Sequence, residues 1–175
     1  MNSYDISDKH GMMSLEEIDL LKQCVALLPP RPVIVVIGAN VGTATCAIME
    51  ANPQAFIFSI DVKPYVDERN NLDACGLPSL RVVRLLGKSQ EIGVAFPYRV
   101  DMVLVDGAHH PEAVEGDIAV WKPRARTVIC FHDVDHPNYN DDTGFNFMTH
   151  IVSNAMRDWE RIGQARYLVG FKNEK

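Results

Sequence analysis

The sequence lacks several features that mark particular protein classes. No apolar run is longer than the one from Val33 to Ile37, which has the length of a strand, whereas a membrane span needs about 20 apolar residues. The four cysteines include no C-x-x-C pair, so free thiols in a reducing compartment are the simplest expectation. We therefore expect a cytoplasmic protein that has no membrane partner.

Positive charge is also scarce. Lys and Arg number 17 against 23 Asp and Glu, which leaves a net charge of −6. Because proteins that bind the phosphate backbone are normally basic, we expect no nucleic-acid partner. The hydrophobic content of 47% and the charged content of 23% exclude a disordered or fibrous chain and fit one domain over residues 1–175.

The N-terminal segment has little apolar character. Residues 1–13 contain Asp5, Asp8 and Lys9 and no apolar stretch, so we expect a loose N-terminal arm and no signal peptide. A helix is expected to begin at Ser14, because Ser14 and Glu17 have the spacing of a capping box.

Strand and helix patterns alternate along most of the remaining chain. Short apolar runs predict strands, and apolar residues three and four apart predict helices. The expected strands are 33–37, 56–60, 80–85, 102–105 and 127–131, and the expected helices are 14–28, 43–51, 65–75, 110–122 and 146–159, followed by a strand pair near 161–162 and 167–171. This alternation predicts a Rossmann-like three-layer αβα sandwich, with a mostly parallel sheet of about seven strands and an antiparallel C-terminal strand.

Polar residues follow each of the five expected parallel strands. Such positions meet at the carboxyl edge of a parallel sheet, which is where ligands bind. We therefore expect a cleft lined by Asn40, Asp61, Ser89, Asp106 with His109, and His132 with Asp133.

A glycine turn follows the first expected strand. Gly38 and Gly42 allow the backbone to approach a ligand closely. Asp61, about 20 residues further on, is placed to accept hydrogen bonds from both hydroxyls of a ribose. The same residues also fit a tight turn and a loop cap without a ligand. An NAD-binding turn is a further alternative, although the G-x-G-x-x-G order is missing.

Several stretches carry a resemblance to a known family. They are 33–45 (VIVVIGANVGTAT), 58–62 (FSIDV), 101–109 (DMVLVDGAH) and 128–134 (VICFHDV), preceded by 10–14 (HGMMS). In order and spacing they resemble the class I S-adenosylmethionine-dependent methyltransferases. The match is closest to the small bacterial branch that includes sugar and macrolide O-methyltransferases and cephalosporin-hydroxylase-like proteins, and it covers nearly the whole chain.

The resemblance implies S-adenosylmethionine as the cofactor and assigns its contacts. The methionine part would lie along the first turn, the ribose on Asp61, and the adenine beside Val62 and Ser89. One position departs from the family pattern, since Val36 stands where the family often has Glu or Asp. The implied cofactor-binding residues are Gly38, Ala39, Asn40, Gly42, Thr43, Asp61, Val62, Lys88, Ser89 and Asp106.

The resemblance also implies a metal site and a general base. In metal-dependent O-methyltransferases, residues matching Asp106, His132 and Asp133 hold a divalent cation such as Mg²⁺. His132 is a departure, because imidazole suits zinc, iron or manganese better than magnesium. His109 matches the position of a general base, so His109, Asp106 and Asp133 are the implied catalytic residues. Capping and turn-forming roles stay open as alternatives.

Three functions are compatible with these patterns. The first is methylation of a hydroxyl group on a small-molecule acceptor. The second is an NAD-dependent oxidoreductase, and the third is a non-catalytic cofactor-binding or assembly module, which Val36 favours. Because little chain is left for a substrate domain, the acceptor pocket would come from the N-terminal arm, from the loop 135–146 with Tyr139 and Phe145, or from a second subunit of a homo-oligomer.

Overall fold

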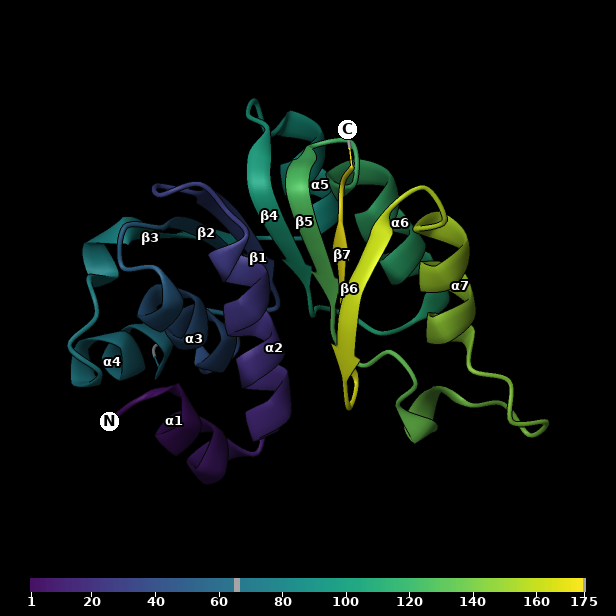
Figure 1. The fold of residues 1–175 in the computed structure, drawn as a ribbon, viewed down its shortest axis with the longest axis horizontal. Coiled ribbons are helices and arrows are strands. Elements are labelled where there is room, and N and C mark those ends of the chain that lie inside the picture. The colour runs from purple at the N-terminus through teal and green to yellow at the C-terminus, as the bar shows by residue number, and fades with distance from the viewer. Residues whose placement is uncertain (65–66, 175) are drawn as a thin grey trace.

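The computed structural model describes residues 1–64 and 67–174, and within these residues seven strands form one sheet in the order β3-β2-β1-β4-β5-β7-β6 (Figure 1). Strands β1 to β5 pair in parallel, whereas β7 runs antiparallel to both β5 and β6. This topology confirms the predicted sheet with its antiparallel C-terminal strand. The strands are β1 (Val33–Ile37), β2 (Phe56–Asp61), β3 (Val82–Leu86), β4 (Val100–Val105), β5 (Ala125–Phe131), β6 (Glu160–Ala165) and β7 (Leu168–Lys172).

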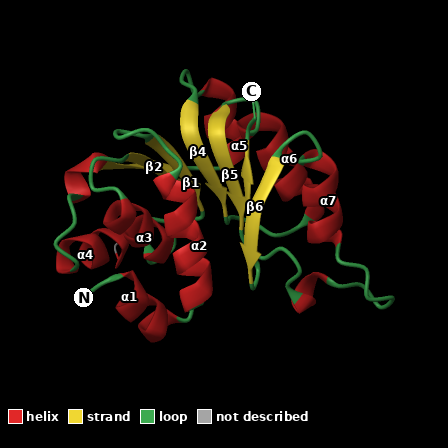
Figure 2. Cartoon of the chain, in the orientation of Figure 1, coloured by secondary structure: helices red, strands yellow, loops and turns green. Residues whose placement is uncertain are grey.

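Helices cover both faces of the sheet, as Figures 1 and 2 show. Alternate residues of β1 enter different cores, with Ile34 and Val36 on one face and Val35 and Ile37 on the other. The first core includes side chains of α1 (Ser3–His10), α2 (Leu15–Ala26), α3 (Thr43–Ala51) and α4 (Asp67–Ala74). The second includes side chains of α5 (Ser89–Ala95), α6 (Pro111–Trp121) and α7 (Phe147–Ala155).

The N-terminal segment is helical, so the expectation of a loose arm is wrong. Asn2 and Asp5 form a reciprocal capping box at the start of α1. The side chain of Ile6 is fully buried in the first core. The backbone N–H of Ser3 donates to Glu50 of α3 at 2.6 Å, and the Ser3 hydroxyl donates to the same carboxylate at 2.5 Å. These contacts fix α1 against the body of the domain.

Other element boundaries differ in smaller ways. The capping box of Ser14 and Glu17 is present at the start of α2, as predicted. Helix α4 begins at Asp67, and the first two residues of its predicted range, 65 and 66, lie outside the described residues. Helix α7 ends at Ala155 instead of residue 159. Helix α5 is an element that the sequence patterns missed.

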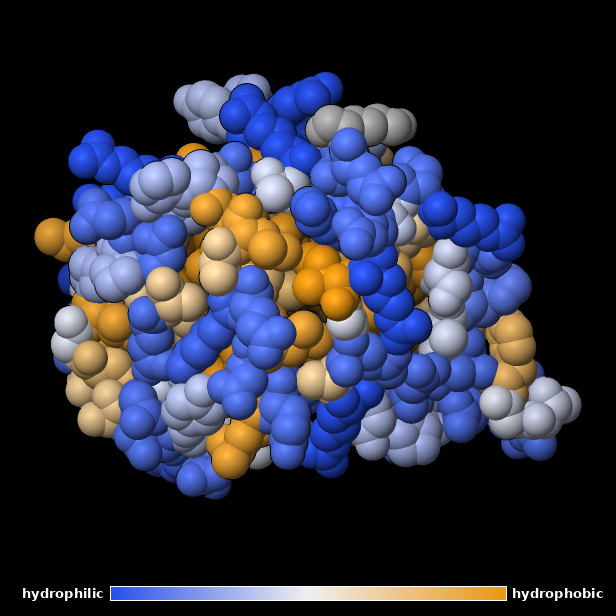
Figure 3. Space-filling model, in the orientation of Figure 1, coloured by the Kyte–Doolittle hydropathy of each residue, from blue (hydrophilic) through white to orange (hydrophobic). Residues whose placement is uncertain are grey.

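The outer surface is mainly polar on the face drawn in Figure 3, where apolar side chains gather near the middle and hydrophilic ones surround them. None of the helices in the described part of the chain has the length and apolar character needed to cross a membrane.

The packing of α1 predicts a measurable contribution to stability. Ile6→Ala removes apolar volume from a fully buried position, so we expect the free energy of unfolding to fall by about 2–5 kcal/mol. Urea denaturation, monitored by circular dichroism, measures this free energy of unfolding. The control Leu80→Ala, at a side chain 87% exposed, should change it by less than about 0.5 kcal/mol. Equally small losses in both variants would show that α1 is loosely attached.

Candidate functional site

A cavity of about 740 Å³ opens at the carboxyl edge of the parallel strands. It is lined by the segments that follow β1, β2, β3, β4 and β5, and by Gly11, Met12 and Met13 before α2. The structure thus brings all the sequence-predicted site residues to one cavity: Gly38, Ala39, Asn40, Gly42, Thr43, Asp61, Val62, Lys88, Ser89, Asp106, His109, His132 and Asp133.

The turn after β1 is built on two glycines that no other residue can replace without a shift. Gly38 has a φ of +85°, and a Cβ there would lie 1.9 Å from the carbonyl oxygen of Asp106. Gly42 has a φ of +87°, and its Cβ would lie 2.7 Å from Cγ of Glu68. The turn therefore packs directly on the segment after β4 and exposes its backbone to the cavity.

Asp61 is held in place at the end of β2 by backbone donors. Its Oδ2 accepts from the N–H of Asn40 at 3.1 Å, and its Oδ1 accepts from the N–H of Lys63 at 3.0 Å. The neighbouring side chain of Val62 is 62% exposed at the rim of the cavity. A fixed carboxylate beside an exposed apolar side chain can bind the hydroxyl groups of a ribose and the face of a base.

A buried carboxylate beneath the turn was not found from the sequence. Glu68 accepts hydrogen bonds from the hydroxyls of Thr45 and Ser59, each at 2.7 Å, and pairs with Arg84 at 2.8 Å. Because Gly42 rests on Glu68, this network supports the glycine turn from below. These partners lie on α3, β2, β3 and α4, so no local pattern could have indicated them.

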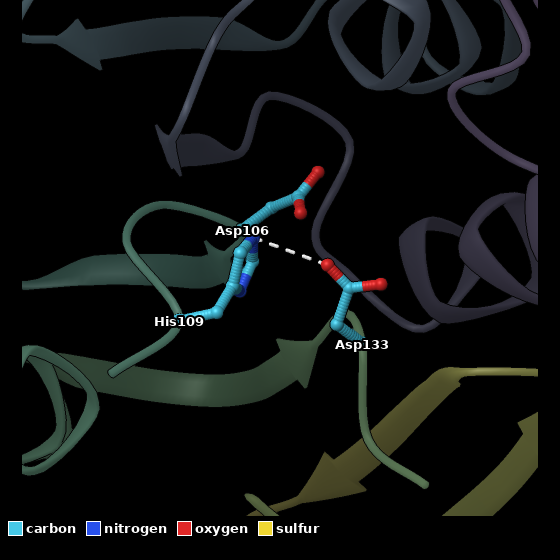
Figure 4. Close-up of side chains that lie close together, drawn as sticks. All are labelled: Asp106, His109 and Asp133. Atoms are coloured by element: carbon cyan, nitrogen blue, oxygen red, sulfur yellow. Dashed lines mark ion pairs between the residues drawn. The ribbon is translucent and has the colours of Figure 1, made fainter. Parts of the chain in front are cut away.

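Asp106, His109 and Asp133 come together beyond the ends of β4 and β5 (Figure 4). One candidate ligand atom from each lies within 4.8 Å of the others, and Nε2 of His109 is 3.1 Å from Oδ2 of Asp133. Burial raises the pKa of Asp133, but the ion-pair contact with His132 and the charge of His109 outweigh it, so the net pKa is lowered. Asp133 is therefore a carboxylate at neutral pH.

His132 lies deeper than this group and is only 6% exposed. Its Nδ1 is 3.1 Å from Oδ1 of Asp106 and 3.5 Å from Oδ1 of Asp133, and its Nε2 is 3.3 Å from Oε1 of Glu17, in ion-pair contacts. Burial lowers the pKa of His132, but these carboxylates outweigh it and raise the pKa to about 12. An imidazolium has no lone pair for a metal, so the structure favours His109 over His132 as the third member of a ligand group.

The sequence indicates a role for Glu17 only in a capping box with Ser14. Besides the N–H of Ser14 at 2.6 Å, its carboxylate accepts the N–H of Tyr167 at 3.0 Å and pairs with His132. Burial raises the pKa of Glu17, but the His132 contact and these backbone donors outweigh it, and the net pKa is lowered. One carboxylate thus links α2, the turn before β7 and the cavity wall.

At the β3 side of the cavity, Ser89 begins α5 and donates its hydroxyl to Asp117 of α6. Burial raises the pKa of Asp117 to about 6, against the lowering effect of the Ser89 hydrogen bond. The ammonium group of Lys88 is instead 3.8 Å from Glu91, at the surface. Asp117 had no assigned role in the sequence.

Two further segments lie close to residues of the cavity wall. The amide of Asn40 contacts Sδ of Met12 at 3.0 Å, which holds the segment between α1 and α2 against the glycine turn. The ring of Tyr139 lies 5.5 Å from the ring of His109, whereas Phe145 is 48% exposed and packs on His150 at 5.2 Å. Of the two aromatic residues expected near an acceptor, Tyr139 is therefore the one beside the site.

Known structures share this fold over most of the present chain. The O-methyltransferase NovP matches with a TM-score of 0.73 and 15% identity, covering 95% of this chain and 83% of that one. An rRNA-methylase from Clostridium thermocellum, described as putative, matches with a TM-score of 0.69 and 16% identity, covering 93% and 98%. The mycinamycin methyltransferase MycE, solved with Mg, SAH and mycinamycin VI, matches with a TM-score of 0.68 and 12% identity, covering 99% and 55%.

The sequence comparisons are more specific. No curated protein sequence matches the chain. A sequence model of the family described as a methyltransferase domain matches residues 35–134, which include the glycine turn, Asp61 and the group around Asp106. This match covers more than half of the 175 residues. The chain therefore belongs to the class I S-adenosylmethionine-dependent methyltransferases.

Proposed function

We propose that this methyltransferase transfers a methyl group to a hydroxyl oxygen of a small molecule. The observation that carries the proposal is the pairing of His109 with Asp133 at 3.1 Å, in the same cavity as the glycine turn and Asp61. A hydroxyl group must lose its proton as its oxygen attacks the methyl carbon, and a histidine oriented by a carboxylate can accept that proton.

The residues present fit the cofactor. Thr43 lies at the start of α3, and its hydroxyl is buried without a hydrogen-bond partner among the described residues. Together with the positive end of the helix, this hydroxyl suits a carboxylate such as that of the methionine part. Val36, where the family often has an acid, is fully buried in the first core and supplies no charge. When bound, the cofactor supplies a methyl group already activated by its sulfonium.

The remaining contacts of the proposal follow the cavity wall. Asp61 would accept the ribose hydroxyls, and Val62 would cover one face of the adenine. Gly38, Ala39, Asn40 and Gly42 would lie along the methionine part, with Asp106 at the methyl end and Lys88 and Ser89 at the adenine end. The protein then contributes mainly alignment and exclusion of water.

His109 has one nitrogen available for proton transfer. Nε2 of His109 lies 3.1 Å from Oδ2 of Asp133. In the tautomer that carries the hydrogen on Nε2, Nδ1 of His109 has the lone pair that would accept the proton of the acceptor. The Asp133 carboxylate stabilises the imidazolium that forms. This arrangement requires no bound ion.

A metal-assisted form of the same reaction uses the same three side chains. Two carboxylates and an imidazole, from Asp106, Asp133 and His109, fit a divalent ion, and this set suits Mn²⁺ better than Mg²⁺. An ion there would lower the pKa of a bound hydroxyl group. His109 would then be a ligand instead of the base.

The acidic chain favours a small molecule over RNA as the acceptor. A net charge of −6 disfavours contacts with phosphate groups, although rRNA methylases occur among the structural matches. Four free cysteines support a location in the reducing cytoplasm. A second subunit that completes the acceptor side stays a prediction from the sequence.

Cofactor identity is tested at Asp61. Asp61→Ala removes two accepted hydrogen bonds and the ribose contact, so we expect the affinity for S-adenosylmethionine in calorimetric titration to fall by about 10- to 100-fold. The control Asp73→Ala, on the exposed side of α4, should leave it unchanged. Titration with NAD should show no binding. Tight NAD binding without S-adenosylmethionine binding would refute the proposal.

Catalysis is tested at His109. His109→Ala removes the proton acceptor, so we expect kcat for S-adenosylhomocysteine release with catechol and sugar acceptors to fall by about 10²- to 10⁴-fold. The Kd for S-adenosylmethionine should stay the same. The neighbouring side chain of His110 is 64% exposed and serves as the matched control in His110→Ala. Equal rates in the two variants would rule out a base role for His109.

The metal-assisted form is tested by direct binding of Mn²⁺, followed by electron paramagnetic resonance. We expect saturable binding to the unaltered protein and at least a tenfold loss of affinity in the Asp106→Asn/Asp133→Asn double variant, because both charged ligands are removed. Asp141→Asn/Asp142→Asn, in the exposed loop, is the control of equal charge. If the protein binds no Mn²⁺ and keeps full activity after treatment with a chelator, the reaction needs no metal and the metal-assisted form is refuted.

A further inference from the structure

Asp117 is a buried carboxylate that pairs with no cation among the described residues. It lies on α6, is 1% exposed, and still contributes to the wall of the cavity. Within residues 1–64 and 67–174, no basic side chain forms an ion pair with it. Leaving such a group unneutralised is costly, since a buried charge needs strong hydrogen bonds or a partner. Its retention at the cavity wall calls for a functional explanation.

The hydrogen bonds of Asp117 are all on one of its oxygens. The Ser89 hydroxyl and the side-chain nitrogen of Gln90, the latter at 2.8 Å, both donate to Oδ1. The same nitrogen of Gln90 also donates to the carbonyl of Ala113 at 3.1 Å, so both of its hydrogens are used. Oδ1 is thereby saturated and the carboxylate plane is fixed. Oδ2 accepts no hydrogen bond from the described residues.

The space beside Oδ2 is open to the cavity. A Cβ placed on Gly107 would lie 3.9 Å from Oδ2 and 3.1 Å from Cγ2 of Ile37, and Gly107 and Asp117 both line the cavity. Because residue 107 is a glycine, it places no side chain of its own between this oxygen and a ligand. Oδ2 is not among the fully buried atoms that lack a hydrogen-bond partner, so solvent in the open cavity can reach it. A ligand that displaces this solvent has to supply a donor, because an acceptor left without a hydrogen bond costs about 1–3 kcal/mol.

The position of Asp117 in the cavity determines which part of a bound nucleoside it can contact. Ser89 follows β3 by three residues, and β3 pairs with β2 so that Leu86 is opposite Asp61. Asp117 contacts Ser89 and Gln90, and therefore lies on the β3 side of the ribose carboxylate, whereas His109 and Asp133 follow β4 and β5. A nucleoside with its ribose on Asp61 and its sulfonium toward His109 places its base at Asp117.

We propose that Asp117 determines the specificity for adenine, with Oδ2 accepting a hydrogen bond from the amino group on C6 of the purine. This inference rests on the proposed function. A 6-oxo purine carries an acceptor at that position, which a carboxylate oxygen repels. Ser89 and Gln90 act as positioning residues, because they hold the carboxylate through Oδ1. Oδ2 then accepts the hydrogen bond from the base.

The test compares S-adenosylhomocysteine with S-inosylhomocysteine, which differ at C6, by calorimetric titration. The unaltered protein should bind the adenine compound about tenfold more tightly or better, the value of one hydrogen bond to a charged group. In Asp117→Asn the amide oxygen can keep the bonds from Ser89 and Gln90, so an NH₂ group replaces Oδ2. That group repels the amino group of adenine and donates to a 6-oxo group, so the ratio of the two affinities should fall at least tenfold.

The control is Glu115→Gln, on the same helix, which removes the same charge from an exposed side chain outside the cavity wall. It should leave the ratio unchanged. Because both ligands are titrated into one protein preparation, partial unfolding of a variant cancels in the ratio. An unchanged ratio in Asp117→Asn, with S-adenosylhomocysteine bound by the unaltered protein, would overturn this inference alone. Failure of the unaltered protein to bind S-adenosylhomocysteine would overturn the proposed function together with it.

Discussion

The close approach of Gly38 to the backbone of Asp106 is the constraint on which the site depends. A Cβ at Gly38 would sit 1.9 Å from the Asp106 carbonyl oxygen, so any side chain there would push the turn after β1 away from the segment after β4. The turn carries the backbone proposed to lie along the methionine part of the cofactor, and the segment carries Asp106 and His109. Because the turn and the segment are in contact, the residues that they carry line the same cavity. The parallel register of β1 with β4, which pairs Ile37 with Val105, aligns the two ends for this contact.

Buried charge near the cavity is handled in two different ways. Glu68 and His132 are surrounded by groups that neutralise them, with Arg84 beside Glu68 and three carboxylates around His132. Such groups form rigid support, because breaking one partner leaves an uncompensated charge. Among the described residues, Asp117 is held by neutral donors on Oδ1, and none of them donates to Oδ2. Glu68 and His132 therefore stabilise the cavity wall, whereas Asp117 has an oxygen that can bind a ligand.

The sheet and the outline of the site were predictable from local patterns. Apolar runs such as Val33–Ile37 and the polar residues at strand ends are local features of the sequence. The structure confirms the mostly parallel seven-stranded sheet with an antiparallel C-terminal strand that they predict. Helix α5 was missed because it is short and contains Gly93. That glycine is needed for packing, since a Cβ there would lie 2.8 Å from the ring of Trp121. The contacts of Glu17 with His132 and of Ser89 with Asp117 join distant parts of the chain, so no spacing rule finds them.

Glu17 has a consequence for how this protein can change over evolution. Its carboxylate caps α2, accepts the N–H of Tyr167 at 3.0 Å, and pairs with His132 beside Asp106. Selection for thermal stability and selection for chemistry therefore act on the same side chain. A replacement that preserved only the helix cap would leave the charge of His132 without one of its partners. Substitutions of Glu17 in the first turn of α2 should therefore be limited more by its contact with His132 at the cavity than by its role as a helix cap.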